Sequence, residues 1–315
     1  MDSCTNKVHI IGEAARGWLS QGQHGKVFAA VTHATYLLTE EEELVWLGTA
    51  ETPMHRRCIQ LPSPLPRLAV GSTFAVKDHS IELESGTNLD FRASKIWETP
   101  AIPAGDLVES KLLPDKLHTF CDTFLAQKVP VGFGRLIQPV IQIAKKQDSS
   151  TGIQLENILT MSAWPIIERV ARACLSHDLS GVLLQAEALI GLGEGLTPSG
   201  DDFLGGLFFA RYLLSCSYPQ LIYLEFDNLP DRIDAFRPST NLISFTLLKD
   251  NALGHAPDPL YRFGIILLSN QSIDCAVSAA SELTTLGHST GWDLLTGFLV
   301  GMLLTFTDKL YIPRS

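Results

Sequence analysis

The sequence predicts an α+β protein, in which a β-rich N-terminal domain, barrel-like or sandwich-like, precedes a mostly α-helical C-terminal domain. Short segments rich in β-branched and aromatic residues fill the first third of the chain. Later in the chain apolar residues recur at helical spacing. The two kinds of segment do not alternate, as they would in a βαβ protein. We therefore expect a β-rich domain over 1–105 and a mostly helical domain over 106–315.

Strand signals come first in the chain. VFAAVTHATYLLT (27–39) is followed by ELVWLGTA (43–50), and the four glutamates at 40–43 interrupt the apolar pattern, which is typical of a hairpin. RLAVGSTFAVKDHSIELES (67–85) alternates in places and is broken by a glycine and an aspartate. Short strands with such breaks favour a small barrel or sandwich.

Helical spacing of apolar residues dominates the rest of the chain. We place Pro165 in a first helical turn, where proline is tolerated. The expected helices lie within 107–126, after Pro114, and over 162–178, 179–191, 200–214, 240–254, 259–269 and 291–306.

The composition limits the partners of this protein. The chain has 315 residues and a formal net charge of −10, and no run of Lys or Arg exceeds two residues. This argues against binding to nucleic acid, which needs clustered cations. The apolar stretches at 204–214 and 294–306 are shorter than the ~20 residues that span a bilayer, so we expect buried helices and no membrane contact.

The six cysteines are far apart and form no CxxC pair. A disulfide framework or a zinc site would need closer spacing, so we expect free thiols. Residues 1–17 hold no apolar core of a signal peptide. Both observations predict a cytoplasmic protein.

The most informative stretch is GLGEGLTPSGDDFLGG (191–206). It lacks the lysine of a Walker A loop and the glycine spacing of a dinucleotide fingerprint. Part of it, SGDDFLGG (199–206), is echoed by TGWDLLTG (290–297), and each copy opens an apolar helix. The two helix starts could therefore face one another across a single pocket.

Two interpretations of this stretch remain open. In the structural one, Ser199 and Asp202 form a capping box, and the same holds for Thr290 and Asp293. In the functional one, hydroxyls and backbone N–H groups at the helix start hold an anion. Asp201 and Asp202 would then bind a substrate amide, or Mg²⁺ through water. The density of glycines favours the functional interpretation, because each glycine inside a helix costs roughly 1 kcal/mol.

The string GLTPSGDDFLGG (195–206) resembles the signature of the AllH family, long carried as a domain of unknown function. GHSTGWDLLTGFLVG (287–301), STNLISFTLLKDNALG (239–254) and GKVFAAVTHATYLL (25–38) are similar to further segments of that family. The named member is a subunit of bacterial oxamate carbamoyltransferase, which acts in the anaerobic breakdown of allantoin.

The resemblance implies a carbamoyltransferase subunit in allantoin and purine degradation, which is inactive alone if its partners complete the site. The reaction would convert oxalurate and phosphate to oxamate and carbamoyl phosphate, or run in reverse. The implied partners are the other subunits and a small anionic substrate, and a homodimer is a further expectation. No cofactor is required, although Mg²⁺ remains an option. The alternatives are a non-catalytic scaffold or regulatory subunit, and an Mg²⁺-assisted phosphoryl-transfer enzyme.

The candidate site residues are those that match the motifs. The catalytic candidates are Asp201, Asp202 and His288, and the first two are also the candidate metal ligands. The glycine-rich stretches contain neither Arg nor Lys, so Arg211, Arg237 or a partner subunit would supply a cation. The candidate substrate- and anion-binding residues are Gly195, Thr197, Ser199, Gly200, Ser239, Thr240, Ser289, Thr290, Gly291 and Asp293.

Overall fold

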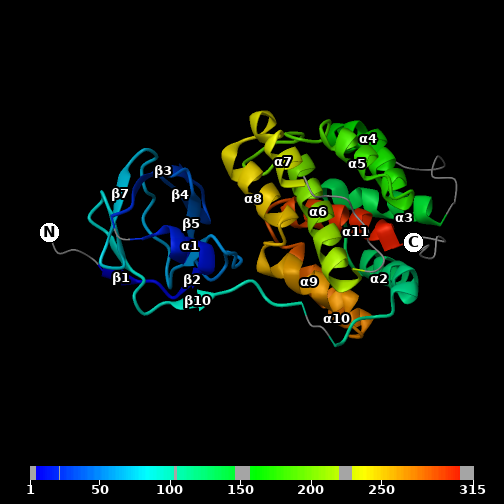
Figure 1. The fold of residues 1–315 in the computed structure, drawn as a ribbon, viewed down its shortest axis with the longest axis horizontal. Helices are drawn as coiled ribbons and strands as arrows, with labels where there is room; N and C mark the ends of the chain where they lie inside the picture. The colour runs from blue at the N-terminus through cyan, green and yellow to red at the C-terminus, as the bar shows by residue number, and fades with distance from the viewer. Residues whose placement is uncertain (1–4, 21, 103–104, 146–156, 220–228, 306–315) are drawn as a thin grey trace, which may run out of the picture. The chain divides into compact units, whose positions relative to one another are not determined.

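A computed structural model describes residues 5–20, 22–102, 105–145, 157–219 and 229–305. The chain divides into two compact units, Met1–Pro100 and Ala101–Ser315 (Figure 1). The first unit is built from strands and the second from helices, which confirms the predicted fold class. The division falls shortly before the expected boundary at residue 105.

The described strands of the N-terminal unit form one curled, half-barrel sheet of ten strands. Their spatial order is β1-β9-β8-β7-β3-β4-β5-β6-β2-β10. A short helix, α1 (Glu13–Trp18), follows the second strand. The strands are β1 (Thr5–Lys7), β2 (Ile10–Gly12), β3 (His24–Ala30), β4 (Ala34–Thr39), β5 (Leu44–Gly48), β6 (Cys58–Gln60), β7 (Thr73–Lys77), β8 (Ser80–Leu83), β9 (Asn88–Asp90) and β10 (Lys95–Trp97).

The predicted hairpin is present, with one correction. The segment 27–39 is not a single strand, because β3 and β4 pair with each other in antiparallel fashion around a turn at 31–33. The turn residues are Val, Thr and His, which have no turn preference, so the sequence pattern did not indicate a turn here. β4 pairs with β5 as expected. β7 and β8 form the hairpin within 67–85.

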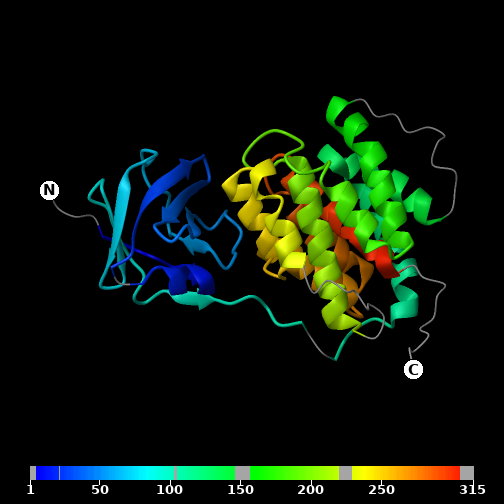
Figure 2. The ribbon, with the colours of Figure 1, turned by 45° about the horizontal axis from the view of Figure 1, so that its top comes forward.

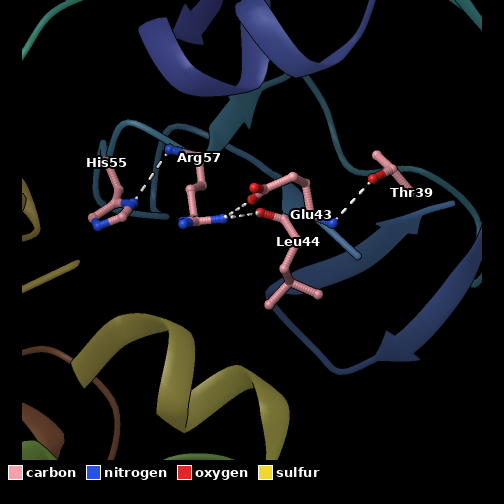
Figure 3. A network of polar contacts seen from close by, with 5 residues as sticks. All are labelled: Thr39, Glu43, Leu44, His55 and Arg57. Atoms are coloured by element: carbon pink, nitrogen blue, oxygen red, sulfur yellow. Dashed lines mark hydrogen bonds and ion pairs between the residues drawn. The ribbon is translucent and has the colours of Figure 1, made fainter. Parts of the chain in front are cut away.

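A polar network holds the long connection between β5 and β6 (Figure 3). The guanidinium of Arg57 donates to the Glu43 carboxylate at 3.0 Å and to the Leu44 carbonyl at 3.2 Å. The Arg57 backbone N–H donates to Nδ1 of His55, a side chain that is buried and stacked on Trp46. Every polar group named here has a partner within the unit, so we assign the network a structural role.

The C-terminal unit is a helical bundle (Figure 2). Its helices are α2 (Leu113–Gln127), α3 (Ile137–Ala144), α4 (Ile158–Leu175), α5 (Leu179–Ala186), α6 (Ser199–Ser217), α7 (Leu229–Asp234), α8 (Leu242–Ala252), α9 (Asp258–Leu268), α10 (Ile273–Leu283) and α11 (Thr290–Met302). The predicted helices correspond to α2, α4, α5, α6, α8, α9 and α11. Helices α1, α3, α7 and α10 were not predicted.

The start of α4 corrects the expectation for Pro165. The helix begins at Ile158, and Asn157 caps it by accepting a hydrogen bond from the Leu159 backbone N–H at 2.8 Å. Pro165 therefore lies inside the helix rather than in its first turn. The missing proline N–H leaves the carbonyl of Met161 without its helical donor.

Helices α6 and α11 are the most buried elements of the bundle. Every residue of α11 from Gly291 to Met302 is buried, and so is the first half of α6. A helix surrounded on all sides needs no polar face, which explains the long apolar stretches. None of the described helices is both long and apolar enough to cross a membrane. The described cysteines are free thiols, as expected.

Candidate functional site

Glycines allow α6 and α11 to pack with their backbones in contact. A Cβ at Gly297 would overlap the carbonyl oxygen of Phe203, and a Cβ at Gly206 would overlap that of Leu294. Farther along, a Cβ at Gly301 would lie 2.8 Å from the carbonyl oxygen of Leu207. From the Phe203–Gly297 contact to the Leu207–Gly301 contact the position moves toward the C-terminus on both helices, so the helices run parallel. The hydroxyls of Thr197 and Thr290 are 3.2 Å apart, so the two N-termini lie together.

The packing has local two-fold symmetry that follows the sequence echo. Gly206 corresponds to Gly297 in the two copies of the motif, and Phe203 corresponds to Leu294, so the two contacts above are equivalent. Gly200 and Gly291, the second residues of α6 and α11, are also equivalent in the two copies, and each packs against a backbone carbonyl. A Cβ at Gly200 would overlap the Leu189 carbonyl, and one at Gly291 would overlap the Leu283 carbonyl. The predicted meeting of the two helix starts is therefore observed.

The N-terminus of helix α8 lies beside the start of α6, where hydrogen bonds to Asp201 hold it. The Asp201 carboxylate accepts from the Gly191 backbone N–H at 2.7 Å, from the Ser244 hydroxyl at 2.6 Å and from the Thr240 hydroxyl. One turn farther along α6, a Cβ at Gly205 would lie 2.7 Å from the side-chain nitrogen of Asn251. Helices α6 and α8 thus also run in the same direction.

Asp202, in contrast, is buried with one carboxyl oxygen left without a partner among the residues that the structure describes. Its side chain is in the first turn of α6 and the residue is only 6% exposed. Its Oδ2 atom has no hydrogen-bond partner among the described residues. Burial raises the pKa of Asp202 well above its ordinary value, and the negative charge of Asp293 raises it further. Interactions with the hydroxyls of Thr290 and Thr197 lower it by less.

Asp293 is the equivalent residue of α11 and is fully buried. Its Oδ1 atom accepts from the Phe133 backbone N–H at 2.7 Å, while Oδ2 has no partner among the described residues. Burial raises the pKa of Asp293 to about 6. The Phe133 hydrogen bond, the hydroxyls of Ser199 and Ser289, and the charge of His288 all oppose this rise.

The capping-box interpretation is wrong for both helices. The N-cap residues are Pro198 and Ser289, and neither makes a side-chain capping bond. The hydroxyl of Ser199 instead interacts with Asp293, and that of Thr290 with Asp202. Because the two N-termini are adjacent, the hydroxyl at the start of each helix interacts with the carboxyl group of the other helix.

The glycine amides expected to cradle an anion are occupied. The backbone N–H of Gly200 donates to the Leu192 carbonyl at 2.8 Å, and that of Gly291 donates to the Leu286 carbonyl at 3.0 Å. Gly200 and Gly291 are thus positions of close packing, and their amides are not free donors. The hydroxyls of Thr197 and Thr290, 3.2 Å apart and both half-buried, are the polar groups at the surface of this site.

The remaining candidates lie around this centre. Gly195, Ser239 and His288 are exposed. Gly195 has a φ of +95°, which only glycine adopts readily, and the Ser239 carbonyl lies against the Gly191 turn. His288 acts electrostatically on Asp293. The described residues contain no group of three or more His, Cys, Asp or Glu side chains placed to hold a metal ion.

Sequence reasoning missed the segment that covers Asp293. This is the short 3-10 helix η2 (Gly132–Leu136). Gly132 has a φ of +53°, and a Cβ there would lie 2.5 Å from Oδ1 of Asp293. The signal was the string PVGFGRL (130–136), in which two glycines flank an aromatic residue without any helical spacing.

These features define an α+β protein whose helical unit is built around two parallel, glycine-rich helices with a pair of buried carboxyl groups at their shared N-terminal end. The family model described as oxamate carbamoyltransferase subunit AllH matches residues 189–302. The matched region contains α6, α8 and α11, so the resemblance read from the motifs is confirmed there. The segment 25–38 lies outside the match. No solved structure matches this chain.

Proposed function

We propose that this protein is a subunit of an oxamate carbamoyltransferase-like enzyme of allantoin and purine catabolism. It would take part in the conversion of oxalurate and phosphate to oxamate and carbamoyl phosphate, or in the reverse reaction. The observation that carries the proposal is the AllH family match over residues 189–302, which includes every element of the candidate site except η2.

The site supports the binding of a small anion. The N-termini of α6, α8 and α11 meet, and each carries a partial positive charge from its helix dipole. Thr197 and Thr290 add hydroxyl donors at the half-buried rim. Oxamate, oxalurate and carbamoyl phosphate all carry an anionic carboxylate or phosphate, which such a site favours.

The glycine-rich stretches supply no cation. We propose that the cation for the transferred group comes from Arg237, in the exposed 3-10 helix η3 (Arg237–Ser239) before Thr240, or from a partner subunit. Arg211 is half-buried in the middle of α6, away from the N-terminus, and is the weaker candidate. If a partner subunit supplies this cation, the activity of the chain would depend on that subunit.

The test is phosphate-dependent cleavage of oxalurate by the purified chain, followed as release of carbamoyl phosphate, with and without added Mg²⁺. Activity would place the catalytic groups within this chain. If the folded chain shows neither turnover nor binding of oxamate, oxalurate or carbamoyl phosphate, also in the presence of its partner subunits, the proposal fails.

One observation favours the scaffold alternative. Gly200, Gly206 and Gly297 are all explained by backbone packing, without a ligand. Under that alternative the chain would assemble with its partners and bind none of the three anions. Calorimetric titration of the chain with oxamate separates the two functions.

A further inference from the structure

Two carboxyl oxygens at the shared N-terminal end of α6 and α11 are buried without a hydrogen-bond partner among the described residues. They are Oδ2 of Asp202 and Oδ2 of Asp293, and the two residues are 6% and 0% exposed. The charge of Asp293 acts on Asp202, so the two carboxyl groups lie near each other. Buried carboxylates that lack partners and repel each other are costly. The pair therefore needs a positively charged partner or a shared proton.

The local two-fold symmetry of the two helix starts gathers further oxygen atoms around this pair. Asp202 of α6 corresponds to Asp293 of α11, and the hydroxyls cross between the helices. Thr290 interacts with Asp202, and Ser199 interacts with Asp293. A hydroxyl that donates its proton to a carboxylate keeps its lone pairs. The groups that meet here are thus carboxyl and hydroxyl oxygens, which are the ligands that hard divalent cations prefer.

The number of carboxyl groups favours Mg²⁺. This ion is commonly held by one or two carboxylates, and water and substrate phosphates complete its coordination. It therefore needs no third acidic side chain, and the described residues contain no group of three or more His, Cys, Asp or Glu side chains placed for a metal ion. Asp201 is already engaged by the protein, because one of its oxygens accepts from the Gly191 backbone N–H and the other from the Ser244 hydroxyl.

The charge balance at the helix starts also favours a divalent cation. Two ionised carboxylates would repel a small anion beside Thr197 and Thr290. A monovalent cation would leave one of the two negative charges in place, whereas a divalent cation neutralises both. The partial positive charges of the helix N-termini then attract the anion.

We propose that Asp202 and Asp293 together bind a divalent cation of the Mg²⁺ type between the N-termini of α6 and α11, and that this cation binds the carboxylate or phosphate oxygen of a small anion. The metal ligands are then one residue from each helix, and Asp201 is a structural residue that holds α8. The cation supplies a positive charge that the glycine-rich stretches lack. The identity of the anion rests on the proposed function, whereas the cation site rests on the structure alone.

The first test is binding of Mn²⁺ to the full chain after removal of metals with EDTA, followed by electron paramagnetic resonance. Mn²⁺ takes the same oxygen ligands as Mg²⁺, so the wild type should bind it saturably and Mg²⁺ should compete. Asp202→Asn and Asp293→Asn should each weaken Mn²⁺ binding by more than about tenfold, because each removes a charged ligand. Glu194→Gln is the control, because it removes an exposed carboxylate from the preceding turn and should bind Mn²⁺ as the wild type does.

The second test connects the cation to the anion. Calorimetric titration of the wild type with oxamate should give an affinity that rises by about tenfold or more when Mg²⁺ replaces EDTA, because the cation is the largest local charge in the site. This increase should be absent in Asp202→Asn and present in Glu194→Gln. Circular dichroism of each variant verifies that it is folded.

The outcomes separate the cation site from the proposed function. A folded wild type without saturable Mn²⁺ binding would overturn the proposal in favour of a shared proton. Mn²⁺ binding that survives both Asp202→Asn and Asp293→Asn would also overturn it, because the cation would lie elsewhere. Oxamate binding of equal affinity in EDTA and in Mg²⁺ would support the proposed function and overturn the role of the cation in it. Mn²⁺ binding at these two residues without any oxamate binding would support the cation site and count against the proposed function.

Discussion

Asp201 and Asp202 are neighbours in the chain, yet their surroundings are opposite. Asp201 accepts hydrogen bonds from Gly191, Thr240 and Ser244, so its negative charge is well stabilised. Asp202 faces Asp293 and has a buried oxygen without a partner. One residue therefore holds three segments together, whereas the other is a buried carboxyl group whose pKa is raised by burial and by the charge of Asp293.

Substitutions at these two positions should differ in their effect on stability at pH 7. Asp201→Asn loses a charged acceptor shared by three donors and should lower the free energy of unfolding by about 3 kcal/mol. Asp202→Asn removes a carboxyl group that is unfavourable to ionise and should leave stability unchanged or increase it. Urea denaturation of both variants measures this. Equal destabilisation by the two substitutions would contradict the assignment.

At the level of residues, the sequence predicted the polar positions of the site better than their roles. Thr197, Ser199, Asp202, Thr290 and Asp293 do gather at one place. Their partners are set by the contact of two helices far apart in the chain, which single-helix capping rules do not describe. The contribution of η2 was missed for the same reason: the Phe133 backbone carries no side-chain signal for its bond to Asp293.

At the level of elements, the packing of α6 on α11 explains most of the glycines. Phe203 and Leu294 present their carbonyl oxygens to Gly297 and Gly206, so neither glycine tolerates a Cβ without separation of the helices. Their close approach also places Asp202 beside Asp293. The distance between α6 and α11 therefore affects the pKa of Asp202, because it sets how close the charge of Asp293 lies.

Alanine at either glycine should be strongly destabilising. Gly206→Ala and Gly297→Ala should each lower the free energy of unfolding by about 3 kcal/mol, because overpacking forces backbone shifts. The local symmetry predicts similar effects for the two. Gly17→Ala is the control, because a Cβ at Gly17 meets nothing within 4 Å. A thermal melt in which Gly297→Ala resembles Gly17→Ala would show that the helices do not pack as described.

The element boundaries show where sequence patterns suffice. The apolar runs within α6 and α11 predicted buried helices correctly. The parallel arrangement of α6, α8 and α11 is not encoded in any local pattern. The repeated motif was the one indication that two helix starts would meet, and it carried no information about α8.

At the scale of the whole molecule, stability should depend on pH through the buried carboxyl pair. The pKa of Asp293 is about 6 in the folded protein, above the value of an unfolded aspartate. Between about pH 4 and pH 6 the folded state thus binds more protons than the unfolded state, and stability falls as pH rises. The shift corresponds to about 3 kcal/mol.

Asp293→Asn should remove this part of the pH dependence while keeping an oxygen for the Phe133 N–H. Denaturation at pH 4, 5, 6 and 7 measures the effect. A variant whose stability profile runs parallel to that of the wild type would show that Asp293 titrates normally.

The N-terminal unit has its own apolar core, in which Ile11, Leu37, Val45 and Ile59 are fully buried. Residues 1–100 should therefore fold alone. A cooperative thermal transition of this fragment, followed by circular dichroism, is the expected result. A fragment without such a transition would mean that the unit depends on the remainder of the chain.

The most direct test of the central claim is a crystal structure of the chain with oxamate. The account predicts that the ligand carboxylate lies at the N-termini of α6 and α11, within hydrogen-bonding distance of the hydroxyls of Thr197 and Thr290. Oxamate bound in order elsewhere on the protein, with this site empty, would contradict it.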